Sequence, residues 1–207
     1  MNETRRPLVA VLDYGIGNLR SAQKGLERVG AEAHLTAETS LIRRADGLVL
    51  PGVGAFGPCM TALEDAGLDG EAQRAVAAGV PFLGICIGMQ MLFEGSEEAP
   101  GRAGLGLLGG KVRRLPDGVK RPQMQWNQLE VQRSDPLLAG LDGAWVYFVH
   151  SFAPEPSPAT IATCSYGGPV TAAVASGAVW GVQFHPEKSG SEGLSLLANF
   201  VAMLAAR

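Results

Sequence analysis

Short apolar runs alternate with segments of helical periodicity through the first half of the chain. Such runs are typical of buried parallel strands, and apolar residues repeated every three or four positions are typical of amphipathic helices. The runs predict strands over residues 8–12, 31–36, 47–50 and 81–85. The periodic segments predict helices over residues 19–29, 41–45, 56–66, 69–78 and, after the last strand, up to residue 93. This alternation indicates a three-layer, doubly wound α/β fold with a mostly parallel sheet.

Beyond residue 105 the pattern changes to short β runs separated by turn residues. They cover residues 110–115, 129–132, 145–149, 160–165 and 170–174. We interpret them as antiparallel strands added to one edge of the sheet. A last buried strand is predicted over residues 179–184, and a closing helix over 193–204 carries an apolar stripe through Leu194 and Leu197. Because no linker or repeat interrupts the pattern, we expect a single domain over residues 1–207.

Composition and charge exclude several functional classes. The chain is 46% hydrophobic and 18% charged, with a formal net charge of −3, so nothing favours binding to nucleic acid or to an anionic membrane. Three widely spaced cysteines lack metal-ligand spacing and indicate free thiols in a reducing compartment. The longest apolar region, residues 80–93, is too short to span a bilayer, and the run at residues 8–12 is too short for an export signal. We therefore expect a cytoplasmic protein.

The segment Gly84-Ile-Cys86-Ile-Gly88 joins a predicted strand to a helical pattern. A nucleophile on a sharp strand-to-helix turn needs small neighbours because the backbone there is strained and crowded, and the two glycines meet that need. This is the nucleophile-elbow pattern with sulfur in place of a hydroxyl, and the following helix N-terminus favours a thiolate. From these five residues alone, a packing cysteine between two glycines is an equally good interpretation.

A cysteine nucleophile also needs a base, and the base needs an orienting carboxylate. His185 ends the last predicted strand, on the same rim as Cys86, and Glu187 two residues later shares its face. The loop Pro51-Gly-Val-Gly54 follows another strand and can present backbone N–H groups to an oxyanion, although alone it is better explained as a turn. Each feature has a structural explanation, but their combination favours catalysis.

Two weaker patterns lead to other interpretations. The turn at residues 15–17 resembles a dinucleotide fingerprint, but Arg20 occupies the third glycine position, so we reject it. A basic cluster over residues 111–121 is explained by a solvated hairpin, with a docking face as the alternative. His34 and His150 lack a neighbouring carboxylate of the His185 type, and we interpret His34 as structural.

The motifs Gly84–Gln90 and His185–Glu187 resemble those of class I glutamine amidotransferases. More narrowly, motifs along nearly the whole chain resemble the family of glutaminase subunits of imidazole glycerol phosphate synthases, in histidine biosynthesis. These further motifs are Asp13–Ser21, Pro51–Phe56, Phe93–Glu98, Tyr147–Ser151 and His185–Gly190. The chain departs from the family pattern at Gln123 and Gln125, which replace His and Gly, and at Phe152, which replaces Tyr.

The resemblance implies a glutaminase mechanism. Cys86 would attack the side-chain amide of glutamine, His185 would protonate the leaving ammonia and then activate water, and Glu187 would orient His185. The remaining roles implied are oxyanion donation by Ile87 and by the loop residues Gly52, Val53 and Gly54, and glutamine binding by Gln90, Glu98 and Ser151. No metal or organic cofactor is implied.

A separate (β/α)₈ cyclase subunit is the implied partner, receiving the ammonia in a heterodimer. Lys188 follows Glu187 on the rim, so we expect its side chain at the partner interface, with Tyr147 and Trp126 nearby. A glutaminase subunit of pyridoxal phosphate synthase would share the triad but not the Lys188–Gly190 motif. In a cysteine peptidase of similar topology the base would follow the elbow directly, where Ile87 stands. A non-catalytic binding module is disfavoured because all three triad positions are filled.

Overall fold

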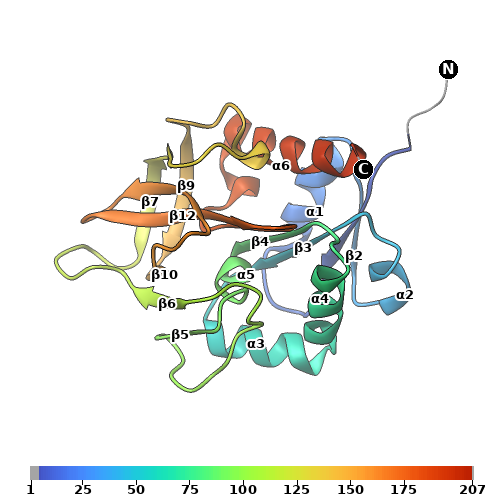
Figure 1. Cartoon of the computed structure of the whole chain (residues 1–207), viewed down its shortest axis with the longest axis horizontal. Helices are drawn as coiled ribbons and strands as arrows, with labels where there is room; N and C mark the ends of the chain where they lie inside the picture. The colour runs from blue at the N-terminus through green and yellow to red at the C-terminus, as the bar shows by residue number, and fades with distance from the viewer. Residues whose placement is uncertain (1–4, 207) are drawn as a thin grey trace.

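The computed structural model describes residues 5–206, and its main sheet has eight strands (Figure 1). In spatial order they are β2 (Glu32–Thr36), β1 (Leu8–Leu12), β3 (Gly47–Gly52), β4 (Phe82–Cys86), β13 (Val179–Val182), β12 (Pro169–Ser176), β11 (Thr160–Ser165) and β8 (Glu130–Val131). The first five are parallel and the last three antiparallel. The predicted mostly parallel sheet with an antiparallel edge is therefore confirmed.

Helices cover both faces of the sheet, which makes three layers (Figure 1). One face carries α1 (Leu19–Arg28) and α6 (Gly190–Ala205), and the other carries α3 (Phe56–Asp65), α4 (Leu68–Ala77) and α5 (Ile87–Gln90). The short α2 (Thr39–Ile42) connects β2 to β3 and starts two residues earlier than predicted. In α6 the predicted stripe is confirmed from Leu197 onward, but at its start Leu196 is fully buried while Leu194 is only partly so. Among residues 5–206, no helix combines the length and apolarity needed to cross a membrane.

The helix predicted through residue 93 is wrong in its extent. α5 ends at Gln90, after about one turn, and the chain turns at Leu92 and Phe93. These two apolar residues are at most 1% exposed. Burial in the core, and not continued helix, explains the apolar spacing that predicted it.

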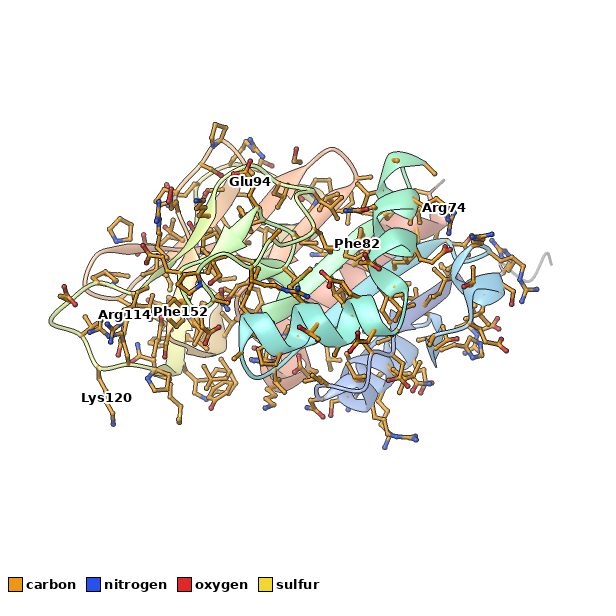
Figure 2. The ribbon with its side chains drawn as sticks, turned by 90° about the horizontal axis from the view of Figure 1, so that it is seen from below. Arg74, Phe82, Glu94, Arg114, Lys120 and Phe152 are labelled. Atoms are coloured by element: carbon orange, nitrogen blue, oxygen red, sulfur yellow. The ribbon has the colours of Figure 1, made fainter. Side chains whose placement is uncertain are left out.

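Not all later strands join the main sheet, so our interpretation of every β run as an edge addition is wrong in part. A three-stranded sheet contains β10 (Phe152–Pro154), β6 (Lys111–Arg114) and β5 (Gly95–Ser96), and a two-stranded ribbon pairs β7 (Gln123–Gln128) with β9 (Trp145–His150). Lys120 projects from the loop between β6 and β7, far from the helices (Figure 2).

The strand register brings three loops to one rim. Gly52 at the end of β3 is opposite Cys86 at the end of β4, and Val182 of β13 is opposite Ile85. The 3-10 turn η2 (Pro186–Lys188) follows β13 after three residues, of which His185 is the last. Functional sites in open parallel sheets lie at such carboxyl ends.

Candidate active site

Cys86 occupies a strained turn between β4 and α5. Its φ of 55° makes it the one non-glycine residue with positive φ in the described part of the chain. A Cβ added at Gly84 would lie 2.7 Å from the carbonyl oxygen of Gly88, and one added at Gly88 would lie 1.7 Å from that of Leu50. The backbones of β3, β4 and α5 can approach this closely only because both positions are glycine. Strain of this kind is typical of functional sites.

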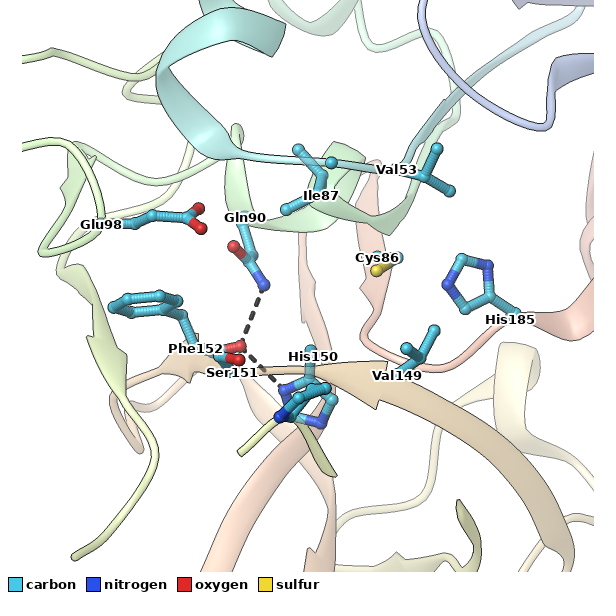
Figure 3. Close-up of a pocket in the computed structure, with 12 residues that line it drawn as sticks. Val53, Cys86, Ile87, Gln90, Glu98, Val149, His150, Ser151, Phe152 and His185 are labelled. Atoms are coloured by element: carbon cyan, nitrogen blue, oxygen red, sulfur yellow. Dashed lines mark hydrogen bonds between the residues drawn. The ribbon is translucent and has the colours of Figure 1, made fainter. Parts of the chain in front are cut away.

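His185 and Glu187 form a buried pair beside Cys86. The Nδ1 of His185 donates to Oε1 of Glu187 at 2.8 Å, and their side chains are 2% and 5% exposed. Burial acts to lower the pKa of His185, but the Cys86 sulfur and the Glu187 carboxylate more than offset it and raise the pKa to about 9. The other ring nitrogen, Nε2, is buried and has no hydrogen-bond partner among the described residues. It is therefore free to exchange a proton at the cavity (Figure 3).

A cavity of about 260 Å³ opens above Cys86 (Figure 3). Its predicted lining residues are Val53, Gly54, Cys86, Ile87, Gln90, Glu98, Ser151 and His185, and it is completed by Pro122, Val149, His150 and Phe152. Two predicted residues lie outside the lining: Glu187 supports His185, and Gly52 packs against Tyr14 and Gly88. A cavity near the small end of the usual range suits a ligand of amino-acid size.

Fixed hydrogen-bond acceptors face this cavity. Glu98 lines it, and its Oε2 accepts the backbone N–H of Phe56 at 2.8 Å, which holds the carboxylate in place. The amino group of Gln90 donates to the carbonyl of Phe152 and to Oε1 of Gln183, both at 3.0 Å, while its own Oε1 has no partner. The Glu98 carboxylate and the Oε1 of Gln90 can therefore accept hydrogen bonds from a ligand that carries an ammonium group.

Sequence reasoning missed two contacts in the site: the bond of Gln183 to Cys86 and the hydrogen-bond partner of His150. Nε2 of Gln183 donates to the Cys86 sulfur at 3.6 Å. Nδ1 of His150 donates to the Phe152 carbonyl at 2.8 Å, and burial lowers the pKa of His150 to about 4, so its ring is neutral. A signal for Gln183 was present, because it is a polar residue in an apolar segment and shares a face with His185 two residues later.

The loop after β3 is held from behind by two side chains. The hydroxyl of Tyr14 donates to the Pro51 carbonyl at 2.8 Å, and the thiol of Cys59 donates to the Val53 carbonyl at 3.5 Å. No side chain in residues 5–206 holds the carbonyl of Gly52, which lies between them. The Gly54 carbonyl has no side-chain partner among these residues either, so side chains restrain the peptides after Pro51 and Val53 and not those after the two glycines.

The β7–β9 ribbon has one exposed apolar face, and on its other face the side chains of β9 are buried. Met124, Trp126 and Trp145 are 63%, 48% and 53% exposed, and the rings of Trp126 and Tyr147 meet edge to face with centroids 6.1 Å apart. Val149 belongs to the same face, because it is the cross-strand partner of Met124, and it also lines the cavity. The exposed face therefore borders the candidate site.

Two hydrogen bonds tie this ribbon to the catalytic segment, and a third fixes the segment itself. The backbone N–H of His185 donates to the Tyr147 carbonyl at 3.0 Å. The Ser189 hydroxyl donates to the His185 carbonyl at 2.7 Å and accepts the N–H of Tyr147 at 3.0 Å. Lys188 is exposed and lies in the chain between His185 and Ser189, the two residues that bond to Tyr147.

Comparisons with known proteins agree along nearly the whole chain. The family model for glutamine amidotransferase class-I matches residues 10–204. The imidazole glycerol phosphate synthase subunit HisH of Synechococcus elongatus is 51% identical over 207 residues, with 97% of this chain and 95% of that relative covered. The subunit of the same name from Deinococcus radiodurans is 50% identical over 204 residues, with 96% and 95% covered. A crystal structure of a glutamine amidotransferase has the same fold, with a TM-score of 0.76, 23% identity, and 96% and 99% of the two chains covered.

Proposed function

The chain belongs to the class I glutamine amidotransferase family, in its group of imidazole glycerol phosphate synthase subunits HisH, and we propose that Cys86, His185 and Glu187 are its catalytic triad. Its activity is the hydrolysis of glutamine to glutamate and ammonia within the synthase, in histidine biosynthesis. One observation carries the proposal. The strained Cys86 and the His185 ring border one cavity, and Glu187 accepts a hydrogen bond from the ring nitrogen that faces away from this cavity.

The geometry supports a two-stage reaction. The Cys86 thiolate attacks the side-chain amide carbon of glutamine, and the resulting oxyanion is stabilised by the N–H of Ile87 and by an N–H of the Gly52–Gly54 loop. His185 gives its proton to the amide nitrogen, and ammonia departs. The substrate is then bound to Cys86 as a thioester. His185 then takes a proton from water, which attacks the thioester, and the tetrahedral intermediate expels the Cys86 thiolate. The new side-chain carboxyl group of glutamate loses its proton to solvent, and His185 stays protonated for the next cycle. Glu187 keeps the imidazole in one orientation throughout.

The cavity wall supports recognition of glutamine by its α-ammonium group. Glu98 offers a carboxylate that is already fixed by the N–H of Phe56, and Gln90 offers its free Oε1. Ser151 lines the same wall and supplies a hydroxyl for the polar end of the substrate. Phe152, which departs from the family pattern, contributes its backbone carbonyl to this wall, so the change of side chain leaves that acceptor in place.

We place a (β/α)₈ cyclase subunit, the partner in a heterodimer, on the exposed face of the β7–β9 ribbon. Large apolar side chains at 48–63% exposure are typical of interface anchors. The face reaches the cavity at Val149, so ammonia released there has a short route toward the partner. The proposed interface includes the three residues expected there from the sequence: Lys188, Tyr147 and Trp126. A single domain and a cytoplasmic location also remain our predictions.

Cys86→Ala tests the proposed triad. We expect it to abolish glutamine hydrolysis, with a loss of several orders of magnitude because the triad acts as a unit, while the fold is retained. Glutamate release is measured with the cyclase subunit and its ligand present. Cys164→Ala is the control, since Cys164 is equally buried but lies outside the cavity lining. Release by Cys86→Ala at a rate near that of the unmodified chain would refute the assignment.

A further inference from the structure

We propose that Gln183 is a further catalytic residue, whose side-chain amide donates a hydrogen bond to the Cys86 sulfur and stabilises its thiolate. The inference rests on the proposed role of Cys86 as the nucleophile. Gln183 follows β13 and is completely buried, and its Nε2 lies 3.6 Å from the sulfur. This distance is within the range for a hydrogen bond to sulfur, whose atomic radius exceeds that of oxygen.

A fixed carbonyl group determines which end of the Gln183 amide faces the sulfur. The Phe152 carbonyl can only accept, so the group that Gln90 directs at it must be the amino group. The second N–H of that amino group is directed at Gln183, so Gln183 must accept it with its Oε1, at 3.0 Å. The amino group of Gln183 is then left for Cys86. The direction of the donor follows from the chain of bonds and does not depend on telling nitrogen from oxygen.

His150 makes this chain of bonds rigid from its far end. Its Nδ1 donates to the same Phe152 carbonyl at 2.8 Å, so that oxygen accepts two hydrogen bonds and its direction is held (Figure 3). His150, Gln90 and Gln183 are each at most 5% exposed, and water has little access to compete. His150 is therefore a positioning residue that acts on Cys86 through three intermediate groups.

The other charged and titratable groups around Cys86 define what Gln183 adds. His185, with Glu187 behind it, lies beside the sulfur and presents a positive charge to it when protonated. Tyr14 and Cys59 lie near it behind the β3 loop, and Glu98 is across the cavity. These three are acids, so none of them supplies a positive charge to the sulfur. Gln183 supplies a neutral, fixed donor that assists the thiolate whatever the protonation state of His185.

The reactivity of the thiol provides a test that needs no glutamine. Alkylation of Cys86 by iodoacetamide is followed as a function of pH in the full chain, and the Cys86 peptide is identified by its mass. Gln183→Met keeps a similar volume without a donor. Gln183→Glu keeps an acceptor for Gln90 but turns a carboxylate toward the sulfur. For both variants we expect the alkylation profile to move to higher pH, with a rate at neutral pH about tenfold to a hundredfold lower, as for the loss of a hydrogen bond to a charged group.

Gln123→Met is the matched control. Gln123 is also completely buried, and its Nε2 donates to the Cys164 sulfur at 3.7 Å, outside the cavity lining. We expect this variant to leave the Cys86 profile unchanged. A merely structural role of Gln183 would loosen the site and speed alkylation, which is the opposite sign. Unchanged or faster alkylation in both Gln183 variants would overturn the proposal.

The kinetics of glutamine hydrolysis separate this proposal from the proposed function. Gln183 is not in the cavity lining, so Gln183→Glu should lower kcat far more than it changes KM. If Cys86→Ala still hydrolyses glutamine, the triad is refuted, while the alkylation profile continues to report on the Gln183–Cys86 bond. If Cys86→Ala is inactive and the profiles of the Gln183 variants match the unmodified chain, only the role of Gln183 is refuted.

Discussion

Replacing Gly88 by alanine would place a methyl group where the backbone of β3 already lies. The added Cβ would be 1.7 Å from the carbonyl oxygen of Leu50 and 2.7 Å from its carbonyl carbon. Because real Cβ contacts are not shorter than 3.0 Å, α5 and β3 must separate by about 1.3 Å. The obstructing atoms are backbone atoms in the middle of a sheet, so no side-chain rotation relieves the contact.

Both stability and activity should fall. Overpacking of a core costs about 1–3 kcal/mol and occasionally more, and the rigid backbone partner puts Gly88→Ala at the upper end of that range. A misplacement of about 1 Å at a catalytic centre costs about 10²-fold in rate. The turn that must move carries Cys86 and the N–H of Ile87, so we expect a rate loss of at least that size.

Gly70→Ala is the matched control, because Gly70 is also a helical glycine and no atom outside its own helical segment lies within 4 Å of its added Cβ. Alanine is better than glycine inside a helix by about 1 kcal/mol, so this variant should be more stable and equally active. Denaturant unfolding and partner-stimulated glutamate release are measured for both. A Gly88→Ala variant as stable and active as the unmodified chain would refute the close approach of β3 and α5.

Three further predictions concern regulation, the interface and pH. The isolated chain should hydrolyse glutamine slowly and gain about 10²–10³-fold with its partner and the cyclase ligand, because the peptide after Gly52 can turn its N–H toward or away from the oxyanion. Lys188→Ala should weaken partner association or stimulation and leave the slow basal rate intact. The pKa of His185, raised from 6.5 to about 9, contributes stability that is complete below pH 6.5 and is lost as the pH rises through 9. Glu187→Gln removes one cause of that shift, so the fall in unfolding free energy over this range should become shallower.

Each of these predictions can fail in a distinct way. A purified single chain with full turnover, unchanged by partner and ligand, contradicts the switch in the loop. For Lys188→Ala, a lower basal rate with normal affinity and stimulation would move Lys188 into the glutamine site. Equal slopes of stability against pH in the unmodified chain and in Glu187→Gln would show that the pair does not set the pKa of His185.

The sequence was most informative where burial alone determines structure. The parallel strands β1, β3 and β4 are buried on both faces, so their apolar runs stand out without knowledge of their partners. β7 could not be predicted because its sequence, Gln-Met-Gln-Trp-Asn-Gln, is polar and its two apolar residues are exposed. The periodicity of β6 and β9 identified strands, but pairing to distant segments decides which sheet a strand joins.

In the candidate site, too, some features follow from the sequence and others depend on contacts between distant segments. Cys86, His185 and Glu187 lie at predictable strand ends, where the parallel topology brings them together. The contribution of Gln183 depends on a chain of hydrogen bonds through Gln90 to a backbone carbonyl. No local pattern encodes the direction of such a chain, so it requires the structure.

The bonds between β9 and the catalytic turn limit how the subunit could be redesigned. Tyr147 presents its ring to the proposed partner, while its backbone groups bond to His185 and Ser189. A substitution chosen to fit a different partner that moves this strand would also move the imidazole. Partner choice and turnover are therefore not independent properties of β9, and exchange of subunits between related enzymes would succeed most readily through changes at Met124 and Trp145, whose side chains form no hydrogen bond to this unit in the described structure.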